Sequence, residues 1–298
     1  MSPVVSGRQV QSLAAGAILI VAATLIFASQ DAITKHLVAS YPVAFIVLIR
    51  YWAFAAFGLA FFARRTGVRR AMHSSRPLLQ IARGILLLVE IMLMALAYRT
   101  LGLAESMTLF QCYPLIATAL AGMLLRERIG WRRWTSLVVG FFGIVLILRP
   151  GFYVIEIGAV YTLLAALLYA AYQILTRLCG DVDGPSTSFL YVSIVGAVVM
   201  TATAPWSWSA ITPQDGAWLA LLCVMSMAGH YCLIRALSVA PAGFLQPFNY
   251  LQLVWAIGVG WVIFREMPDA ISFLGGALVV GSGLFVAYRE RLRASARR

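Results

Sequence analysis

The chain has 298 residues, of which 62% are apolar and only 11% are charged, and its mean hydropathy is +0.88. A soluble domain is about half apolar and about a quarter charged, so this composition excludes an ordinary soluble protein and indicates an integral membrane protein. The formal charge of +12 does not indicate nucleic-acid binding, because the basic residues separate apolar segments instead of forming one basic face.

Long apolar runs, separated by charged or turn-forming residues, predict ten membrane-spanning helices. In chain order they are expected at 12–37, 42–63, 77–98, 101–125, 132–149, 154–178, 186–205, 214–237, 242–264 and 270–288. Turn residues such as those at 183–185 and 267–269 fill the short connections between these segments. The fold class that follows is an all-α membrane protein.

The basic residues predict how these helices are oriented, because loops rich in Lys and Arg stay in the cytoplasm. With a cytoplasmic N-terminus, few of the 23 basic residues fall in outer loops: Lys35, Arg99, Arg149 and Arg265. Arg50 and Arg83 fall inside spans, and the remainder lie in inner loops or in the C-terminal tail. We therefore expect a multi-pass protein of a bacterial inner membrane with both termini in the cytoplasm.

The sequence contains an internal repeat. The stretch FASQDAITKHL at 27–37 has a counterpart, YAAYQILTRLC at 169–179, in which Gln173 takes the place of Asp31. A basic residue follows four positions later in both copies. Helices rich in Ala and Leu also resemble one another through composition alone, which is the alternative explanation of the likeness. Matched polar positions at a constant offset favour a true repeat.

The repeat predicts two units, 1–151 and 152–298, each with five of the ten helices. Because five is an odd number, the second unit must enter the membrane from the opposite side. Two inverted repeats around a central cavity, with a binding site near the middle of the membrane, are typical of transporters.

The segments RGILLLVEIMLMALAYRTLGLAES (83–106) and LQPFNYLQLVWAIGVGWVIFREMPDAISFLGGALVVGSG (245–283) resemble the EamA-type drug/metabolite transporter superfamily. The Arg-Glu pairs at 126–127 and 265–266, each at the end of an apolar helix, fit the same pattern. The resemblance covers essentially the whole chain. It implies ten helices around a central cavity and the export of amino acids or other metabolites.

Ionisable residues inside apolar spans are costly and are therefore functional candidates. Arg50 and Glu90 lie at similar depth, roughly 12 Å from the outer ends of neighbouring helices at 1.5 Å per residue, which predicts an ion pair. That pair could brace the bundle or contact substrate. Asp31 and Lys35, spaced i, i+4, predict a local pair, with an Asp31 that lines the cavity as the alternative. His230 could titrate during transport, or it could be a neutral histidine hydrogen-bonded to a neighbouring helix.

Prolines interrupt two spans at corresponding places in the two units. Pro114 and Pro247 each lie among amide and phenol side chains, which supply hydrogen-bond donors and acceptors near freed backbone carbonyls. The pattern points to a transport site, and a tightly packed kink is the alternative. With nearby aromatic residues included, the predicted substrate-binding set is Asp31, Glu90, Tyr98, Gln111, Tyr113, Tyr172, His230, Gln246, Asn249, Tyr250 and Trp255.

The sequence contains no GxxxxGK[ST] loop, no HExxH and no GxSxG motif, so it predicts neither an enzyme nor a cofactor or metal requirement. The predicted function is export of small metabolites by alternating access, with aromatic or bulky hydrophobic amino acids favoured as substrate. The expected partners are this small molecule and membrane lipids, and the oligomeric state is left open, a monomer included. The alternatives are proton-coupled efflux of cationic drugs and a non-transporting membrane scaffold.

Overall fold

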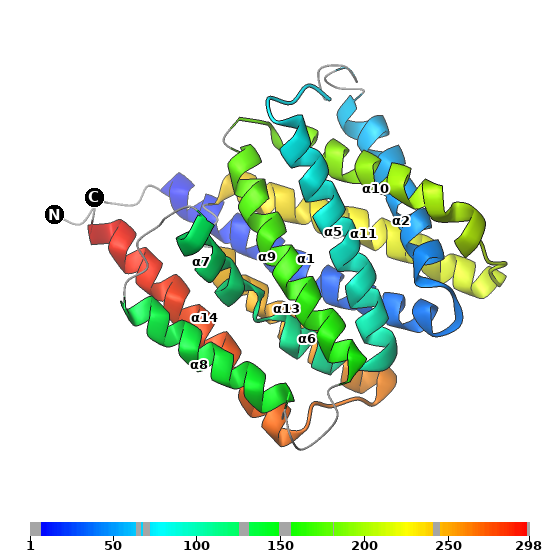
Figure 1. Ribbon diagram of the computed structural model, residues 1–298. Coiled ribbons are helices and arrows are strands. Elements are labelled where there is room, and N and C mark those ends of the chain that lie inside the picture. Colours follow the sequence, from blue (N-terminus) through cyan, green and yellow to red (C-terminus); the bar gives the residue numbers. More distant parts are fainter. Residues whose placement is uncertain are drawn as a thin grey trace.

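The computed structural model describes residues 7–63, 67, 72–124, 131–148, 156–180, 182–240 and 245–296. In these ranges all regular secondary structure is helical, as Figure 1 shows. The first half contains α1 (Gly7–Ser40), α2 (Val43–Gly58) with a π-helical end η1 (Leu59–Ala63), α5 (Pro77–Thr100), α6 (Leu103–Phe110), α7 (Tyr113–Leu124) and α8 (Trp131–Leu148).

The second half contains α9 (Ile157–Gly180), α10 (Pro185–Ser207), α11 (Pro213–Val239), the 3-10 helix η2 (Gln246–Tyr250), α13 (Leu251–Val259), the π-helix η3 (Gly260–Phe264) and α14 (Ala270–Ala296). α1 begins and α14 ends on the same side of the bundle (Figure 1). The two chain ends of the helical region are therefore close to the same face.

Seven of the described helical stretches are long and apolar enough to cross a membrane. They are Leu13–Ser40, Val43–Phe61, Pro77–Thr100, Ile157–Thr176, Ser186–Thr203, Pro213–Leu233 and Pro247–Phe264. Trp134–Leu148 and Ala270–Phe285 are shorter apolar helices. The predicted span 101–125 is divided into α6 and α7, neither of which is long enough by itself. The chain is an all-helical multi-pass membrane protein over its described part.

The helices pack in pairs that join the two halves of the chain. α1 packs against α11, α5 against α9, α2 against α10, and α8 against α14. The last pair approaches closely, because a Cβ atom at Gly143 or at Gly275 would lie 2.6 Å from the other residue's carbonyl oxygen. Small residues at such crossings are the usual way in which membrane helices come close together.

The two proline-containing segments are interrupted, as the sequence predicts. α6 ends at Phe110 and α7 begins at Tyr113, which places Pro114 in a first helical turn where its missing N–H is not needed. The later segment starts as the 3-10 helix η2, with Pro247 at its beginning, and becomes α-helical only in α13. These interruptions bring side chains of both segments toward the middle of the bundle.

Candidate substrate cavity

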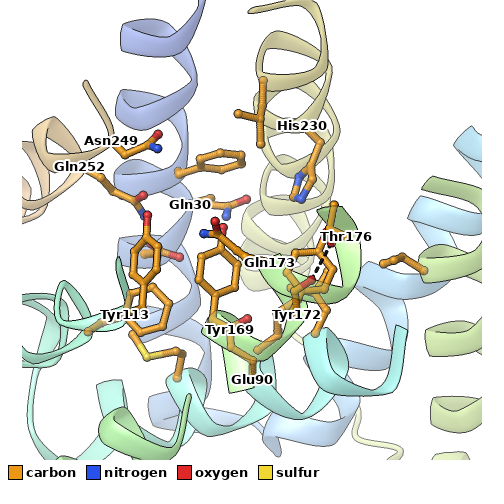
Figure 2. Close-up of a pocket in the computed structure, with 18 of the residues that line it drawn as sticks. Gln30, Glu90, Tyr113, Tyr169, Tyr172, Gln173, Thr176, His230, Asn249 and Gln252 are labelled. Carbon is orange, nitrogen blue, oxygen red and sulfur yellow. Dashed lines mark hydrogen bonds between the residues drawn. The ribbon is translucent and has the colours of Figure 1, made fainter. Parts of the chain in front are cut away.

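A cavity of about 480 Å³ lies inside the bundle, within the size range of sites for drug-sized ligands. Its lining comes from both halves of the chain, including α1, α2, α5, α9 and α11 (Figure 2). It extends from Thr34 and Tyr98 at one end to Asp183 and Ser188 at the other. We call these two ends of the bundle the Lys35 end and the Asp183 end, after the charged residues described below.

One face of α1 lines the cavity. Phe27, Gln30, Asp31 and Thr34 lie at the spacing i, i+3, i+4, i+7, which places them on one side of a helix. Gln252 donates a hydrogen bond to the Asp31 carboxylate at 3.3 Å. The Tyr98 hydroxyl approaches the same carboxylate.

The predicted Asp31–Lys35 pair is wrong. The Lys35 ammonium forms an ion pair with Glu266, and it lies 4.4 Å from the centre of the Phe264 ring. The long Lys35 side chain can extend from the end of α1 toward the connection before α14, away from the carboxylate one turn earlier. Asp31 is left facing the cavity, 9% exposed.

Aromatic rings form two walls. In the tyrosine wall, made of Phe110, Tyr113, Tyr169 and Tyr172, the Tyr113 and Tyr169 ring centres are 4.8 Å apart in a T-shaped pair. Tyr169 and Tyr172 are stacked at 5.7 Å, and Figure 2 shows the three tyrosines in a row above Glu90. In the histidine wall, the His230 ring lies 5.2 Å from Phe27 and 5.3 Å from Phe54. Rings arranged in this way offer faces and edges to a flat ligand.

Four charged side chains of the cavity are nearly fully buried: Asp31, Arg50, Arg83 and Glu90. The predicted Arg50–Glu90 ion pair is not formed. The described salt bridges Lys35–Glu266 and His36–Asp215 involve neither residue. Arg50 and Glu90 lie at a similar depth in the membrane-spanning bundle and line the same cavity. Their charged atoms are not in contact, because similar depth along neighbouring helices does not determine the direction in which each side chain points.

Charged residues at the Lys35 end are held by several protein partners. Glu266 accepts from Lys35 and also from the Leu103 backbone N–H at 3.2 Å. Asp215 accepts from the Tyr41 hydroxyl at 2.8 Å and from the Thr212 hydroxyl at 2.9 Å, and it also pairs with His36. These contacts join α1 to α11 and to the segment before α14 at this end of the bundle.

At the Asp183 end, the Asp183 carboxylate accepts hydrogen bonds from Gln80 at 2.8 Å, from the Ser75 backbone N–H at 3.0 Å, and from the Ser74 hydroxyl. Burial raises the pKa of Asp183, but these hydrogen bonds and the charge of Arg76 outweigh burial and hold its pKa below the ordinary value. The carboxylate fastens the start of α5 to the turn between α9 and α10.

Most of the predicted substrate-binding residues line the cavity: Asp31, Glu90, Tyr98, Tyr113, Tyr172, His230 and Asn249. Three of the others do not. Gln111 is buried at the end of α6, and Trp255 packs against the core cluster around Tyr98 and Phe110. The Tyr250 side chain packs against Gly283 of α14.

Several predicted features lie outside the described residues or side chains. They are the side chains of Gln246 and Arg177, and the residues Arg126, Glu127 and Arg149. Other residues line the cavity but lie outside the predicted substrate-binding set, although Arg50 was considered as a possible substrate contact: Phe27, Gln30, Thr34, Arg50, Phe54, Tyr169, Gln173 and Gln252. Gln30 and Thr34 are four residues apart, and Thr34 is three residues after Asp31, so a helix places all three on one side. This spacing in the sequence could have predicted that Gln30 and Thr34 also line the cavity.

Comparison with known proteins identifies the family of this chain. Residues 14–149 and residues 156–288 each match the sequence model of the EamA-like transporter family. The chain belongs to the EamA-like transporter family. A solved crystal structure with 17% sequence identity superposes with a TM-score of 0.63, over 93% of this chain and 98% of that one. At this identity the superposition shows a shared fold.

Named relatives are transporters of different small molecules. A riboflavin transporter of Vibrio cholerae is 27% identical over 92% of this chain and 93% of its own length. An S-adenosylmethionine uptake transporter of Rickettsia prowazekii is 30% identical over 75% and 76%. A pseudopaline exporter of Pseudomonas aeruginosa is 27% identical over 90% and 94%. The family and these relatives indicate a small-metabolite transporter rather than an enzyme.

Proposed function

We propose that this protein carries a small metabolite with a flat ring system across the membrane by alternating access. The observation that carries the proposal is a cavity of about 480 Å³ between two aromatic walls inside a membrane-spanning bundle. Buried charges beside the rings supply the polar contacts that fix orientation in ligand sites. Ion pairs lie at the Lys35 end of the bundle, and Asp183 at the other end is part of the cavity lining.

We also propose that the two halves, 1–151 and 152–298, are inverted repeats of five spans each. The separate family matches to the two halves support this division. The packing of α1 on α11 is repeated by α5 on α9, as an exchange of the two halves requires. Counting α6 with α7 as one span, and η2 with α13 and η3 as another, gives the predicted ten.

The proposed orientation has both termini in the cytoplasm of a bacterial inner membrane. The placement of Lys and Arg in the sequence supports it. The shared side on which α1 begins and α14 ends (Figure 1) is compatible with it. In this orientation the Lys35 end faces outward and the Asp183 end faces the cytoplasm.

The relatives widen the range of proposed cargo. None of the three is named for an aromatic amino acid, whereas riboflavin and S-adenosylmethionine both carry a fused heteroaromatic ring system on a polar chain. A fused ring with a chain can contact the tyrosine wall and the histidine wall together, while the side chain of an aromatic amino acid is smaller. We therefore place such metabolites ahead of the aromatic amino acids that the sequence favoured. Export, the predicted direction, is that of the Pseudomonas relative.

Counterflow in proteoliposomes tests the proposal. Vesicles preloaded with unlabelled riboflavin, S-adenosylmethionine or tryptophan would receive the labelled form of the same compound outside. We expect exchange of at least one fused-ring metabolite well above protein-free vesicles, and weaker exchange of tryptophan. Net release from preloaded vesicles of known orientation, compared with net entry, assigns the direction. Failure of all these compounds to exchange would favour the non-transporting scaffold.

Proton-coupled efflux of a cationic compound is the second candidate. It is favoured by two buried carboxylates, Asp31 and Glu90, that line one cavity together with tyrosine rings, since carboxylates and ring faces both attract cations. An imposed pH gradient should then drive the movement of a dye such as ethidium, and neutralising either carboxylate should abolish that coupling. Dye movement that ignores the gradient would exclude this candidate.

A further inference from the structure

Arg50 is a buried arginine with few protein partners. It lies on α2, is 5% exposed and lines the cavity. Its Nε atom is buried without a hydrogen-bond partner, and within the described ranges the guanidinium group takes part in no salt bridge or hydrogen bond. The contact that it does make is with the Phe54 ring, whose centre lies 5.6 Å from Cζ. A guanidinium has five N–H donors, and a buried charge is costly unless it is paired.

Arg83 is also buried in the lining, at 2% exposure, but it is held by the protein. One of its terminal nitrogens donates to the Thr176 hydroxyl at 3.3 Å, and the other donates to the Ser188 carbonyl. It also lies over the Tyr172 ring at 5.5 Å. Arg83 therefore joins α5 to α9 and α10. Arg50 makes no comparable hydrogen bonds that join its helix to another described helix.

Asp31 and Glu90 are near enough to interact electrostatically with Arg50, but neither lies within 4.0 Å of its nitrogens as a salt bridge would require. The structure thus leaves the hydrogen-bond donors of Arg50 unused. Those donors form a planar fork that fits the paired oxygens of a carboxylate or a phosphate.

We propose that Arg50 is an anion-binding position of the cavity and holds a carboxylate or phosphate group of the cargo. The inference rests on the proposed function, because it requires that cargo enters this cavity. Asp31 and Glu90 then face the same cargo, and they suit an N–H or cationic group. The cargo class that follows is an amphoteric molecule with a flat ring, an anionic oxygen group and a donor or cation.

A first test needs no ligand. The full chain would be purified in detergent as wild type, Arg50→Gln, Arg50→Lys and Arg83→Gln, and the thermal midpoint of each would be measured. Arg83→Gln should lower the midpoint by several degrees, because it removes hydrogen bonds between helices. Arg50→Gln should leave the midpoint unchanged or raise it, since it removes a buried charge that no salt bridge or hydrogen bond of the protein holds. An equal loss in both glutamine variants would make Arg50 a structural brace and overturn the inference.

A second test measures equilibrium binding of probe pairs that share a ring and differ in one anionic group. The pairs are tryptophan with tryptamine, and riboflavin 5′-phosphate with riboflavin. Wild type should prefer the anionic member by roughly 30-fold or more, the usual effect of removing one member of a buried charge pair. Arg50→Gln should lose this preference and keep its affinity for the neutral or cationic member, while Arg50→Lys should retain part of the preference.

The outcomes separate the two proposals. Binding of the ring probes without preference for the anionic member, or with the same preference in Arg50→Gln, would overturn the role of Arg50 and leave the proposed function standing. Binding of no ring probe to any variant would overturn the proposed function and the inference with it.

Discussion

Charged residues in the middle of the bundle have fewer protein partners than those at its ends. At the Lys35 end, Lys35 and Glu266 pair directly, and Asp215 accepts from several donors. In the middle, Arg50 and Glu90 are buried in one cavity without an ion pair between them. Unpaired buried charge is costly, and we propose that the ligand supplies the missing partners of these residues. The paired charges at the ends hold helices together.

The largest expected effect follows from removing a central charge. Glu90→Gln should reduce transport of the cargo by roughly 30-fold or more, as expected when one member of a buried charge interaction is lost. Initial rates of counterflow measure this change. Glu156→Gln is the matched control, since Glu156 is exposed at the start of α9. If Glu90→Gln fails to accumulate in the membrane while Glu156→Gln does accumulate, Glu90 braces the fold and the comparison breaks down.

Removing the charge of Glu266, at the Lys35 end, should have a smaller effect, which concerns the opening of the cavity. Glu266→Gln weakens the contacts to Lys35 and to the Leu103 N–H, which favours a state open at the Lys35 end. The Glu266 side chain is 38% exposed, so the shift should be about fivefold or less. It is measured as the rate at which an impermeant maleimide labels Thr34→Cys in a background without native cysteines. An unchanged labelling rate would show that this ion pair does not help to close the cavity.

The smallest effect is expected at the Asp183 end, as a dependence of stability on pH. Because the pKa of Asp183 is lowered in the folded protein, its carboxylate stabilises the fold above the ordinary carboxyl pKa, and that contribution is lost as pH falls through the folded-state pKa. The thermal midpoint of wild type should exceed that of Asp183→Asn at pH 7, and the difference should shrink as pH falls below the ordinary carboxyl pKa. A constant difference across this range would contradict the assignment.

The sequence predicts those features of the fold that depend on local composition and on the spacing of residues along the chain. Apolar runs gave the membrane class, and Pro114 and Pro247 marked the two interrupted segments. The ion pairs were predicted less well, because the partner of a charged residue can come from a distant part of the chain. Lys35 was matched to the nearest carboxylate along α1, but its partner, Glu266, follows η3 near the other end of the sequence. Tyr250 and Asn249 are neighbours in sequence, and only the packing of η2 on α14 separates their roles.

The central claim is that cargo binds between the aromatic walls in the middle of the bundle. Its most direct test is counterflow of the identified cargo by Tyr169→Leu, set against Tyr288→Leu. Tyr169 belongs to the tyrosine wall, whereas Tyr288 is 60% exposed near the end of α14. We predict that Tyr169→Leu raises the concentration for half-maximal exchange at least about tenfold, the effect of losing roughly 1.4 kcal/mol of ring contact, and that Tyr288→Leu behaves as wild type. Equal exchange by the two variants would contradict the claim.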